Sequence, residues 1–291
     1  MILRRNLLAL PWFCLPVSAQ RIPRERISYI ADEVARTPAE AIAFARRYGL
    51  RRVELRSVPG TKRGYWDLPE AEQASAVREL ADNGLLISFI DSGLLACPIP
   101  GTTPVRKPGP QEAARFTNRM EDLRKVIGLA QRAQCGKIRC FSFRRVAEPV
   151  ALFPRIAEFI APMAEIAARE GVQLLLENES SCNVNTCVEI EGIMKLLPAT
   201  VGLNWDPGNA SGQERAFPEG YRRLPVGRIG NVQIKGKSIL GTGDGTDWPA
   251  LFRALEADGY RGYFGLETHT SDRVADSHPA LERILKMIGA Q

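Results

Sequence analysis

Short apolar runs alternate with longer amphipathic stretches from residue 27 to the end of the chain. The short runs resemble buried strands, and the longer stretches repeat their apolar residues at the helical period. The predicted strands are Ile27–Ala31, Arg52–Arg56, Leu86–Ser92, Lys137–Phe143, Val172–Asn178, Val201–Asp206, Asn231–Lys235 and Tyr263–Thr268. The predicted helices are Thr37–Tyr48, Pro69–Asn83, Gln111–Gln134, Pro149–Glu170, Glu189–Leu197, Pro249–Asp258 and Pro279–Ile288.

Local signals at the helix ends agree with this pattern. Thr37, Pro38 and Glu40 read as a capping box with proline in the first turn. Glycines follow four of the predicted helices, where a left-handed residue commonly ends a helix. They are Gly49, Gly84, Gly171 and Gly259.

Eight strands that alternate with helices over residues 20–291 predict a single (β/α)8 barrel. An open doubly wound sheet shares the alternation, but it usually has a glycine-rich phosphate-binding first turn. The sequence contains neither a GxGxxG motif nor a P-loop. The glycine-rich segment 241–245 follows the seventh strand and does not open a phosphate-binding helix, so the barrel is favoured.

The first 19 residues have the layout of an export signal. Arg4 and Arg5 precede the short apolar run Leu7–Leu15, and Val17–Ala19 offers a small-residue cleavage site. The run is too short to span a bilayer, and the arginine pair also fits a twin-arginine signal. We therefore expect cleavage after Ala19 and a periplasmic or secreted protein without a stable membrane anchor.

Composition narrows the classes of partner and cofactor. The net charge is +6, but the basic residues are scattered, which disfavours a nucleic-acid partner. Five cysteines remain after the signal, an odd number that does not describe a disulfide framework. They are Cys97, Cys135, Cys140, Cys182 and Cys187. Cys182 and Cys187 are close enough in sequence to form a disulfide if their loop folds back, so that pairing stays open. Two histidines and no C-x2-C pair argue against a zinc cluster.

Four oxygen-bearing side chains stand at the ends of the last four predicted strands: Glu177, Asp206, Gln233 and Glu267. The carboxyl ends of barrel strands meet at one rim, so these side chains should converge. Carboxylates crowded there repel one another, and a divalent cation would remove that repulsion. The alternative is that each acid pairs with a nearby Lys or Arg.

Several motifs in order along the chain resemble the xylose-isomerase-like TIM-barrel superfamily of sugar isomerases and epimerases. They are Asp32-Glu33, Val53-Glu54-Leu55-Arg56, Ile138-Arg139-Cys140-Phe141, Leu174–Glu179, Trp205–Asn209, Gly243–Trp248 ahead of Gly259–Tyr263, and Leu266–His269. The resemblance implies four strand-end ligands for one divalent metal, with two glutamates that move a proton on a sugar carbon. By position these are Glu177, Asp206, Gln233 and Glu267, with Glu177 and Glu267 as the acid/base pair.

The chain departs from the superfamily pattern at two histidines. Gln233 stands where a histidine ligand is usual, and Asn209 replaces the histidine of the frequent Asp-x-x-His on strand six. Some dehydratases of the superfamily have glutamine at that ligand position. An all-oxygen ligand set favours Mn²⁺ or Mg²⁺, with Co²⁺ or Zn²⁺ as alternatives.

The remaining candidates at the predicted mouth have two readings each. Lys235 could contact substrate or form a structural ion pair. His269 could contact substrate or be a solvated residue of a loop. Glu54 and Arg56 share a strand face and could bind substrate or pair with each other. Arg139 could anchor a substrate oxygen or lie in a buried ion pair. Asn209 is a further candidate for binding substrate.

The resemblance implies a small-molecule substrate and a metal-dependent isomerase or epimerase of a sugar or polyol, working through an enediolate. A metal-dependent lyase acting on a keto-sugar or a dehydroshikimate-like acid shares that intermediate. A barrel that binds sugar without turnover remains a third reading, since both histidines are missing. Endonuclease action with a three-zinc cluster is disfavoured by the same shortage. The sequence leaves open whether copies of the chain assemble.

Overall fold

The computed structural model describes residues 22–210, 212–243 and 245–289. The signal segment 1–19 therefore lies outside the described residues. Eight parallel strands form one sheet in the order β1-β8-β7-β6-β5-β4-β3-β2. A parallel bridge between Ile30 and Glu54 joins the two ends, which makes a nearly closed TIM barrel in one domain. This confirms the predicted fold class.

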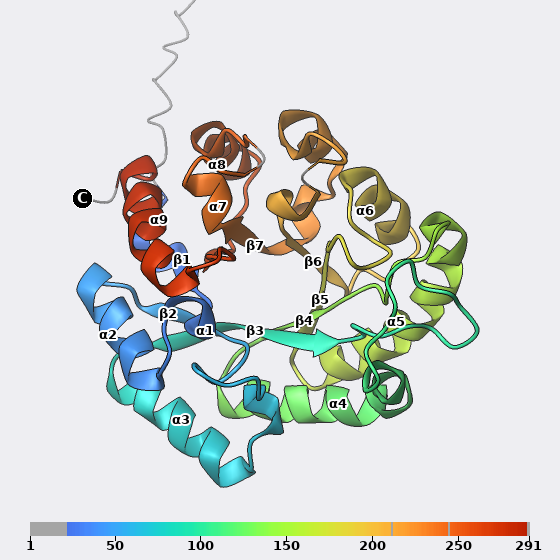
Figure 1. Cartoon of the computed structure of the whole chain (residues 1–291), viewed down its shortest axis with the longest axis horizontal. Coiled ribbons are helices and arrows are strands. Elements are labelled where there is room, and N and C mark those ends of the chain that lie inside the picture. The colour runs from blue at the N-terminus through green and yellow to red at the C-terminus, as the bar shows by residue number, and fades with distance from the viewer. Residues whose placement is uncertain (1–21, 211, 244, 290–291) are drawn as a thin grey trace, which may run out of the picture.

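The strands lie at the centre of the molecule and the helices surround them (Figure 1). The strands are β1 (Ile27–Tyr29), β2 (Arg52–Leu55), β3 (Leu86–Leu94), β4 (Lys137–Cys140), β5 (Gln173–Glu177), β6 (Gly202–Trp205), β7 (Ile229–Lys235) and β8 (Tyr263–Glu267). The helices are α1 (Ala31–Val34), α2 (Pro38–Tyr48), α3 (Glu70–Asp82), α4 (Glu112–Arg132), α5 (Phe153–Arg169), α6 (Cys187–Met194), α7 (Gly236–Ile239), α8 (Trp248–Ala257) and α9 (Arg273–Met287).

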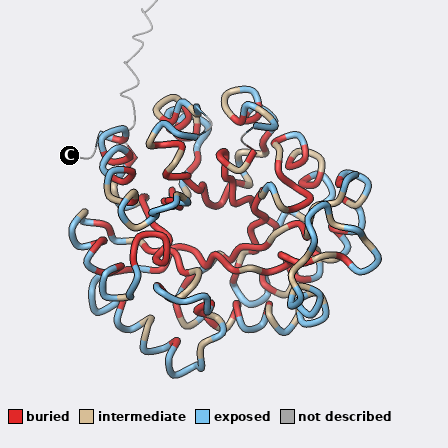
Figure 2. The backbone as a smooth tube through the Cα atoms, viewed as in Figure 1, coloured by how far each residue is buried: buried red, intermediate tan, exposed pale blue. Residues whose placement is uncertain are grey.

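Burial follows the same two layers. The buried backbone forms a continuous inner ring, and the exposed residues lie on the outer faces of the helices (Figure 2). Outward-pointing strand residues such as Leu174 and Leu176 belong to the apolar core between sheet and helices. Residues that alternate with them point into the barrel, so the polar ones there need partners inside it.

The predicted strands all form, and most predicted helices begin and end within a few residues of their expected positions. The four predicted terminal glycines have left-handed φ values between 63° and 82°. Helix α9 begins at Arg273, well before the predicted start, because Asp272 caps it and Pro279 lies inside it rather than in its first turn. The short helices α1 and α7 contain too few residues to show a helical period.

The predicted capping box at Thr37 is only half right. Thr37 accepts a hydrogen bond from the backbone N–H of Glu40, but the Glu40 carboxylate accepts from the N–H of Arg36 instead of Thr37. A complete capping box lies at Thr186 and Glu189, so α6 begins two residues before its predicted start.

The five described cysteines are buried free thiols, so Cys182 and Cys187 form no disulfide. Burial raises the pKa of the Cys182 thiol to about 12. Within the described ranges, every helix is too short or too polar to cross a membrane.

Candidate metal and acid–base site

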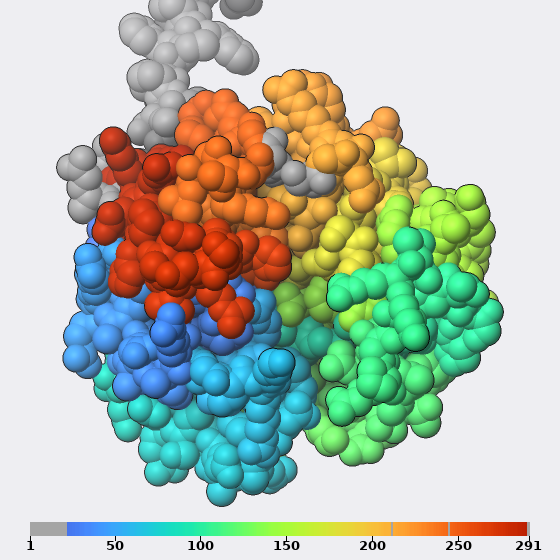
Figure 3. Space-filling model, viewed as in Figure 1, coloured from blue at the N-terminus to red at the C-terminus, as the bar shows by residue number. Residues whose placement is uncertain are grey.

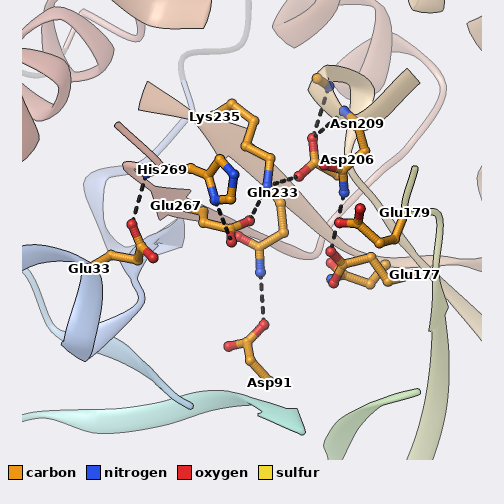
Figure 4. A network of polar contacts seen from close by, with 12 residues as sticks. Glu33, Asp91, Glu177, Glu179, Asp206, Asn209, Gln233, Lys235, Glu267 and His269 are labelled. Atoms are coloured by element: carbon orange, nitrogen blue, oxygen red, sulfur yellow. Dashed lines mark hydrogen bonds and ion pairs between the residues drawn. The ribbon is translucent and has the colours of Figure 1, made fainter. Parts of the chain in front are cut away.

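Three buried carboxylates meet at the rim formed by the carboxyl ends of the strands. Glu177 ends β5, Asp206 directly follows β6, and Glu267 ends β8. One oxygen from each lies within 4.8 Å of the other two (Figure 4). The structure therefore brings together the three acids that strand position alone predicted to converge.

Backbone hydrogen bonds fix the orientation of Asp206. Asn178 joins the ends of β5 and β6, because its amide oxygen accepts from the N–H of Asp206 at 2.9 Å and its amide nitrogen donates to the Asp206 carbonyl at 2.8 Å. Asp206 Oδ1 accepts from the N–H groups of Gly208 at 2.8 Å and Asn209 at 3.2 Å. The other oxygen, Oδ2, is thereby left for a cation.

Lys235 supplies that cation in the structure. Its Nζ lies 3.0 Å from Asp206 Oδ2 and 2.5 Å from Glu267 Oε2, and the side chain is 2% exposed (Figure 4). Of the two readings of Lys235, the structure shows the ion pair.

Two arginines neutralise the remaining oxygens of the glutamate pair. Arg139 Nη1 lies 3.0 Å from Glu177 Oε2, and Arg56 Nη1 lies 3.0 Å from Glu267 Oε1. Arg56 also pairs with Asp32 and Glu33 on α1. Of the two interpretations of Arg139, the structure shows the buried ion pair.

Glu54 and Arg56 do not pair with each other, which excludes one of their two interpretations. Glu54 is fully buried inside the barrel, where its carboxylate accepts from Ser28 Oγ at 2.5 Å and from Gln233 Nε2 at 2.8 Å. Arg56 directly follows β2, at the rim, and pairs with the acids there. Gly265 on β8 makes room for Glu54, because a Cβ at position 265 would lie 2.2 Å from Glu54 Oε1.

Gln233 connects the rim to the barrel interior. Its Nε2 donates to Glu54. It also donates to Asp91 Oδ1 at 3.1 Å (Figure 4). Its Oε1 is buried and has no hydrogen-bond partner among the described residues. The amide therefore presents an unused oxygen, which is the atom that a metal ligand needs.

The local charges shift the pKa values of the three rim acids in different directions. Burial raises the pKa of Glu177, against the opposing charge of Arg139. Burial also raises the pKa of Asp206, to about 7, although Lys235 opposes the shift. Burial would raise the pKa of Glu267 too, but Lys235, His269 and Arg56 together hold it well below its usual range.

Asn209 and His269 lie at the edge of this cluster. Asn209 Nδ2 donates to the carbonyl of Asn178 at 2.8 Å and lies 3.5 Å from Glu177 Oε1. His269 has a positive φ of 46°, its N–H donates to Glu33 Oε2 at 2.8 Å, and its exposed ring has Nδ1 3.7 Å from Glu267 Oε1. Both side chains therefore lie next to the acids at the edge of the cluster.

Two interior residues escaped the sequence reasoning. Asp91 on β3 lies 3.3 Å from Arg139, and Asn204 on β6 donates to Glu177 Oε2 at 2.5 Å. Each is a polar residue at an inward position of a buried strand, and this is the sequence signal that indicates a partner inside the barrel.

A cavity of about 550 Å³ opens beside the acids. Its lining includes Arg56, Asp91, Arg139, Trp66 and Asn118, and it reaches the rim acids through the arginines that pair with them. Figure 3 shows a recess near the centre of this face of the molecule. A small polar molecule placed there would meet the arginines that hold Glu177 and Glu267.

The donor set fits a hard divalent cation. The three carboxylates provide oxygen ligands only, which suits Mg²⁺ or Mn²⁺ better than softer metals. The cluster's own cations compete with such an ion. Lys235 takes up oxygens of Asp206 and Glu267, while Arg139 and Arg56 each pair with one of the glutamates.

Comparisons with known proteins agree with the fold. The family model for the xylose isomerase-like TIM barrel matches residues 42–289. An inosose dehydratase from Yersinia enterocolitica is 26% identical over 194 residues, which are 55% of this chain and 64% of that protein. This chain thus spans less than two thirds of that relative's length.

Solved structures extend the likeness in fold. An L-ribulose 3-epimerase superposes with a TM-score of 0.64 at 23% identity, covering 91% of this chain and 92% of its own. A xylose isomerase-like TIM-barrel protein from Mycobacterium smegmatis, in complex with magnesium, superposes with a TM-score of 0.66 at 17% identity, covering 91% and 97%. At these identities the likeness establishes the shared barrel.

Proposed function

The chain belongs to the xylose isomerase-like TIM-barrel family, and from this premise we propose that it is a divalent-metal-dependent isomerase or epimerase of a sugar or related polyol. The observation that carries the proposal is the convergence of Glu177, Asp206 and Glu267, with oxygens within 4.8 Å of one another. Buried acids are costly unless cations neutralise them, and a cluster of acids with shifted pKa values at the rim of a barrel is typical of a site that binds a metal or transfers protons.

The proposed ligands are the three carboxylates and the amide oxygen of Gln233. When bound, the metal supplies Lewis-acid polarisation of a substrate carbonyl. The barrel protein from Mycobacterium smegmatis, which has the same fold, is in complex with magnesium, and this supports a hard cation as the proposed metal.

The two glutamates supply the proton chemistry. One carboxylate takes the proton from the carbon next to the substrate carbonyl, which leaves the substrate as an enediolate, and the other returns a proton. Return to the neighbouring carbon isomerises the substrate, and return on the opposite face epimerises it. Arg139 and Arg56 hold Glu177 and Glu267 at fixed positions, and the burial of both acids keeps water away from the transfer.

The direct test is deuterium incorporation from D₂O into candidate sugars and keto-sugars, measured by mass spectrometry with Mg²⁺ supplied. We expect exchange by the wild type and a loss of roughly 100-fold or more in Glu177→Gln and Glu267→Gln, since general acid–base catalysis contributes about that much. Glu191→Gln is the control, because Glu191 pairs with Lys195 at the surface. Full exchange by both rim variants would refute the assigned roles.

A lyase of the same fold is the second candidate, and the similarity to an inosose dehydratase favours it. Gln233 at the proposed ligand position points the same way. The two reactions share an enediolate and differ in whether a hydroxyl leaves. Loss of one water from the substrate, detected in the same incubations, would establish elimination. Binding of a sugar without exchange or water loss would instead support the non-catalytic barrel.

Export is a separate proposal that rests on the sequence of residues 1–19. Sequencing the N-terminus of the protein recovered from its native host tests it. A start directly after Ala19 is the expected result, and a retained Met1 would refute cleavage.

A further inference from the structure

Lys235 holds the same carboxylate oxygens that the proposed metal needs. Its Nζ lies 3.0 Å from Asp206 Oδ2 and 2.5 Å from Glu267 Oε2, and no other ion pair of this ammonium occurs among the described residues. Asp206 Oδ2 has no further hydrogen-bond partner in the described chain. The lysine is therefore the cation that Asp206 and Glu267 share when no metal is bound, and Arg56 pairs with the other oxygen of Glu267.

The fold provides a fitted path for the lysine side chain. A Cβ at position 208 would lie 2.6 Å from Lys235 Cγ and 3.1 Å from its Cβ, so the glycine leaves the space that the lysine stem fills. The same glycine donates its N–H to Asp206 Oδ1 at 2.8 Å. Glycine at 208 thus serves both the lysine and the carboxylate with which it pairs.

We infer that Lys235 and a divalent cation compete for the carboxylates of Asp206 and Glu267, so that metal loading moves the Lys235 ammonium away from them and Lys235 sets the metal affinity of the site. The inference rests on the proposed metal-dependent function. Its physical basis is charge: an ammonium and a divalent cation at the same two oxygens repel strongly in a buried site, where water screens little. One of the two must leave.

The test is the affinity of the metal-free protein for Mg²⁺ and Mn²⁺, measured by isothermal titration calorimetry. We expect Lys235→Met to bind roughly ten-fold more tightly or better than the wild type, within the usual range of coupling between sites. Lys137→Met is the matched control. Lys137 also lies on a barrel strand, but it begins β4 at the opposite end and donates to the carbonyl of Gly230 at 2.7 Å. Its replacement should leave metal affinity unchanged.

Thermal unfolding gives a second readout that needs no substrate. Without metal, Lys235→Met should melt below the wild type, because Asp206 and Glu267 lose their shared cation. Saturating Mg²⁺ should raise its melting temperature by more than it raises that of the wild type. Equal or weaker metal binding by Lys235→Met, with equal thermal shifts, would overturn the inference.

A wild-type measurement covers the case in which the variant does not fold. Acetylation followed by mass spectrometry should find Lys235 protected without metal and more reactive as Mg²⁺ is added. Unchanged protection across a titration that saturates the site would overturn the inference.

The outcomes also separate this inference from the proposed function. Tighter binding in Lys235→Met, with no proton exchange in any sugar, would leave the inference standing and remove the activity. Proton exchange into a sugar by the wild type, together with an unchanged metal affinity in Lys235→Met, would support the proposed function and overturn this inference.

Discussion

Replacing Arg139 by methionine removes the cation that neutralises two buried acids of the barrel. The Arg139 side chain is 6% exposed, and its Nη1 lies 3.0 Å from Glu177 Oε2 and 3.3 Å from Asp91 Oδ1. It also donates to the backbone carbonyls of Ser92 at 3.0 Å and Asp91 at 2.8 Å. Methionine keeps much of the volume but none of these bonds.

Removing one partner of a buried ion pair typically costs about 3–5 kcal/mol, because the other charge stays buried without compensation. The two lost backbone hydrogen bonds add to this cost. We therefore expect the Arg139→Met variant to lose at least about 3 kcal/mol of unfolding free energy at neutral pH. Arg223→Met is the control: its pair with Glu191 is exposed, and such pairs contribute about 1 kcal/mol or less.

The loss should depend on pH in a defined direction. Burial already raises the pKa values of Glu177 and Asp91 in the folded wild type, and removing the arginine charge raises them further. A raised carboxyl pKa means that the folded state binds protons more readily than the unfolded chain, so stability falls as the pH rises through that range. The deficit of the variant should therefore shrink as the pH falls from neutral toward about 5.

Urea unfolding, followed by circular dichroism and tryptophan fluorescence at both pH values, measures this deficit. A chelator is added so that no metal replaces the lost cation. A deficit under about 1 kcal/mol at neutral pH, as in an exposed pair, would refute the reasoning. So would an equal deficit at both pH values, since the cost would then not come from the unpaired acids.

Substitutions at three further positions test other parts of the structure by the same unfolding measurement. Gly265→Ala should destabilise the protein by about 1–3 kcal/mol, because the new methyl group collides with the Glu54 carboxylate; unchanged stability would contradict the glycine's role. Thr186→Ala should cost about 1 kcal/mol by removing one half of the capping box, and Thr186→Ser should restore it. Burial lowers the pKa of His278, whose Nδ1 lies 2.8 Å from Tyr48 Oη, so wild-type stability should fall as the pH drops through the ordinary histidine range. In His278→Gln that part of the pH dependence should disappear, and its persistence would exclude this histidine as the cause.

Sequence patterns predicted the barrel well because its determinants are local. Each strand is a short apolar run, and each helix has its own period and end signals, so all eight strands were found. The errors fall where a local signal had two meanings. Pro279 was read as a helix start but lies inside α9. The capping-box pattern predicts that the Glu40 carboxylate accepts from the N–H of Thr37, but it accepts from the N–H of Arg36.

The convergence of Glu177, Asp206 and Glu267 was also predictable, because parallel strands in a barrel deliver their carboxyl ends to one rim. The sequence by itself therefore determined the fold and which acids meet. It could not decide how their charges are neutralised, because the distances that govern Coulomb energy join residues far apart in the chain. Only the tertiary structure assigned Lys235 to Asp206 and Glu267, and Arg139 to Glu177. The tertiary structure also showed that Glu54 bonds to Gln233 inside the barrel and does not pair with Arg56. The register of neighbouring strands sets the depth at which each side chain lies in the barrel.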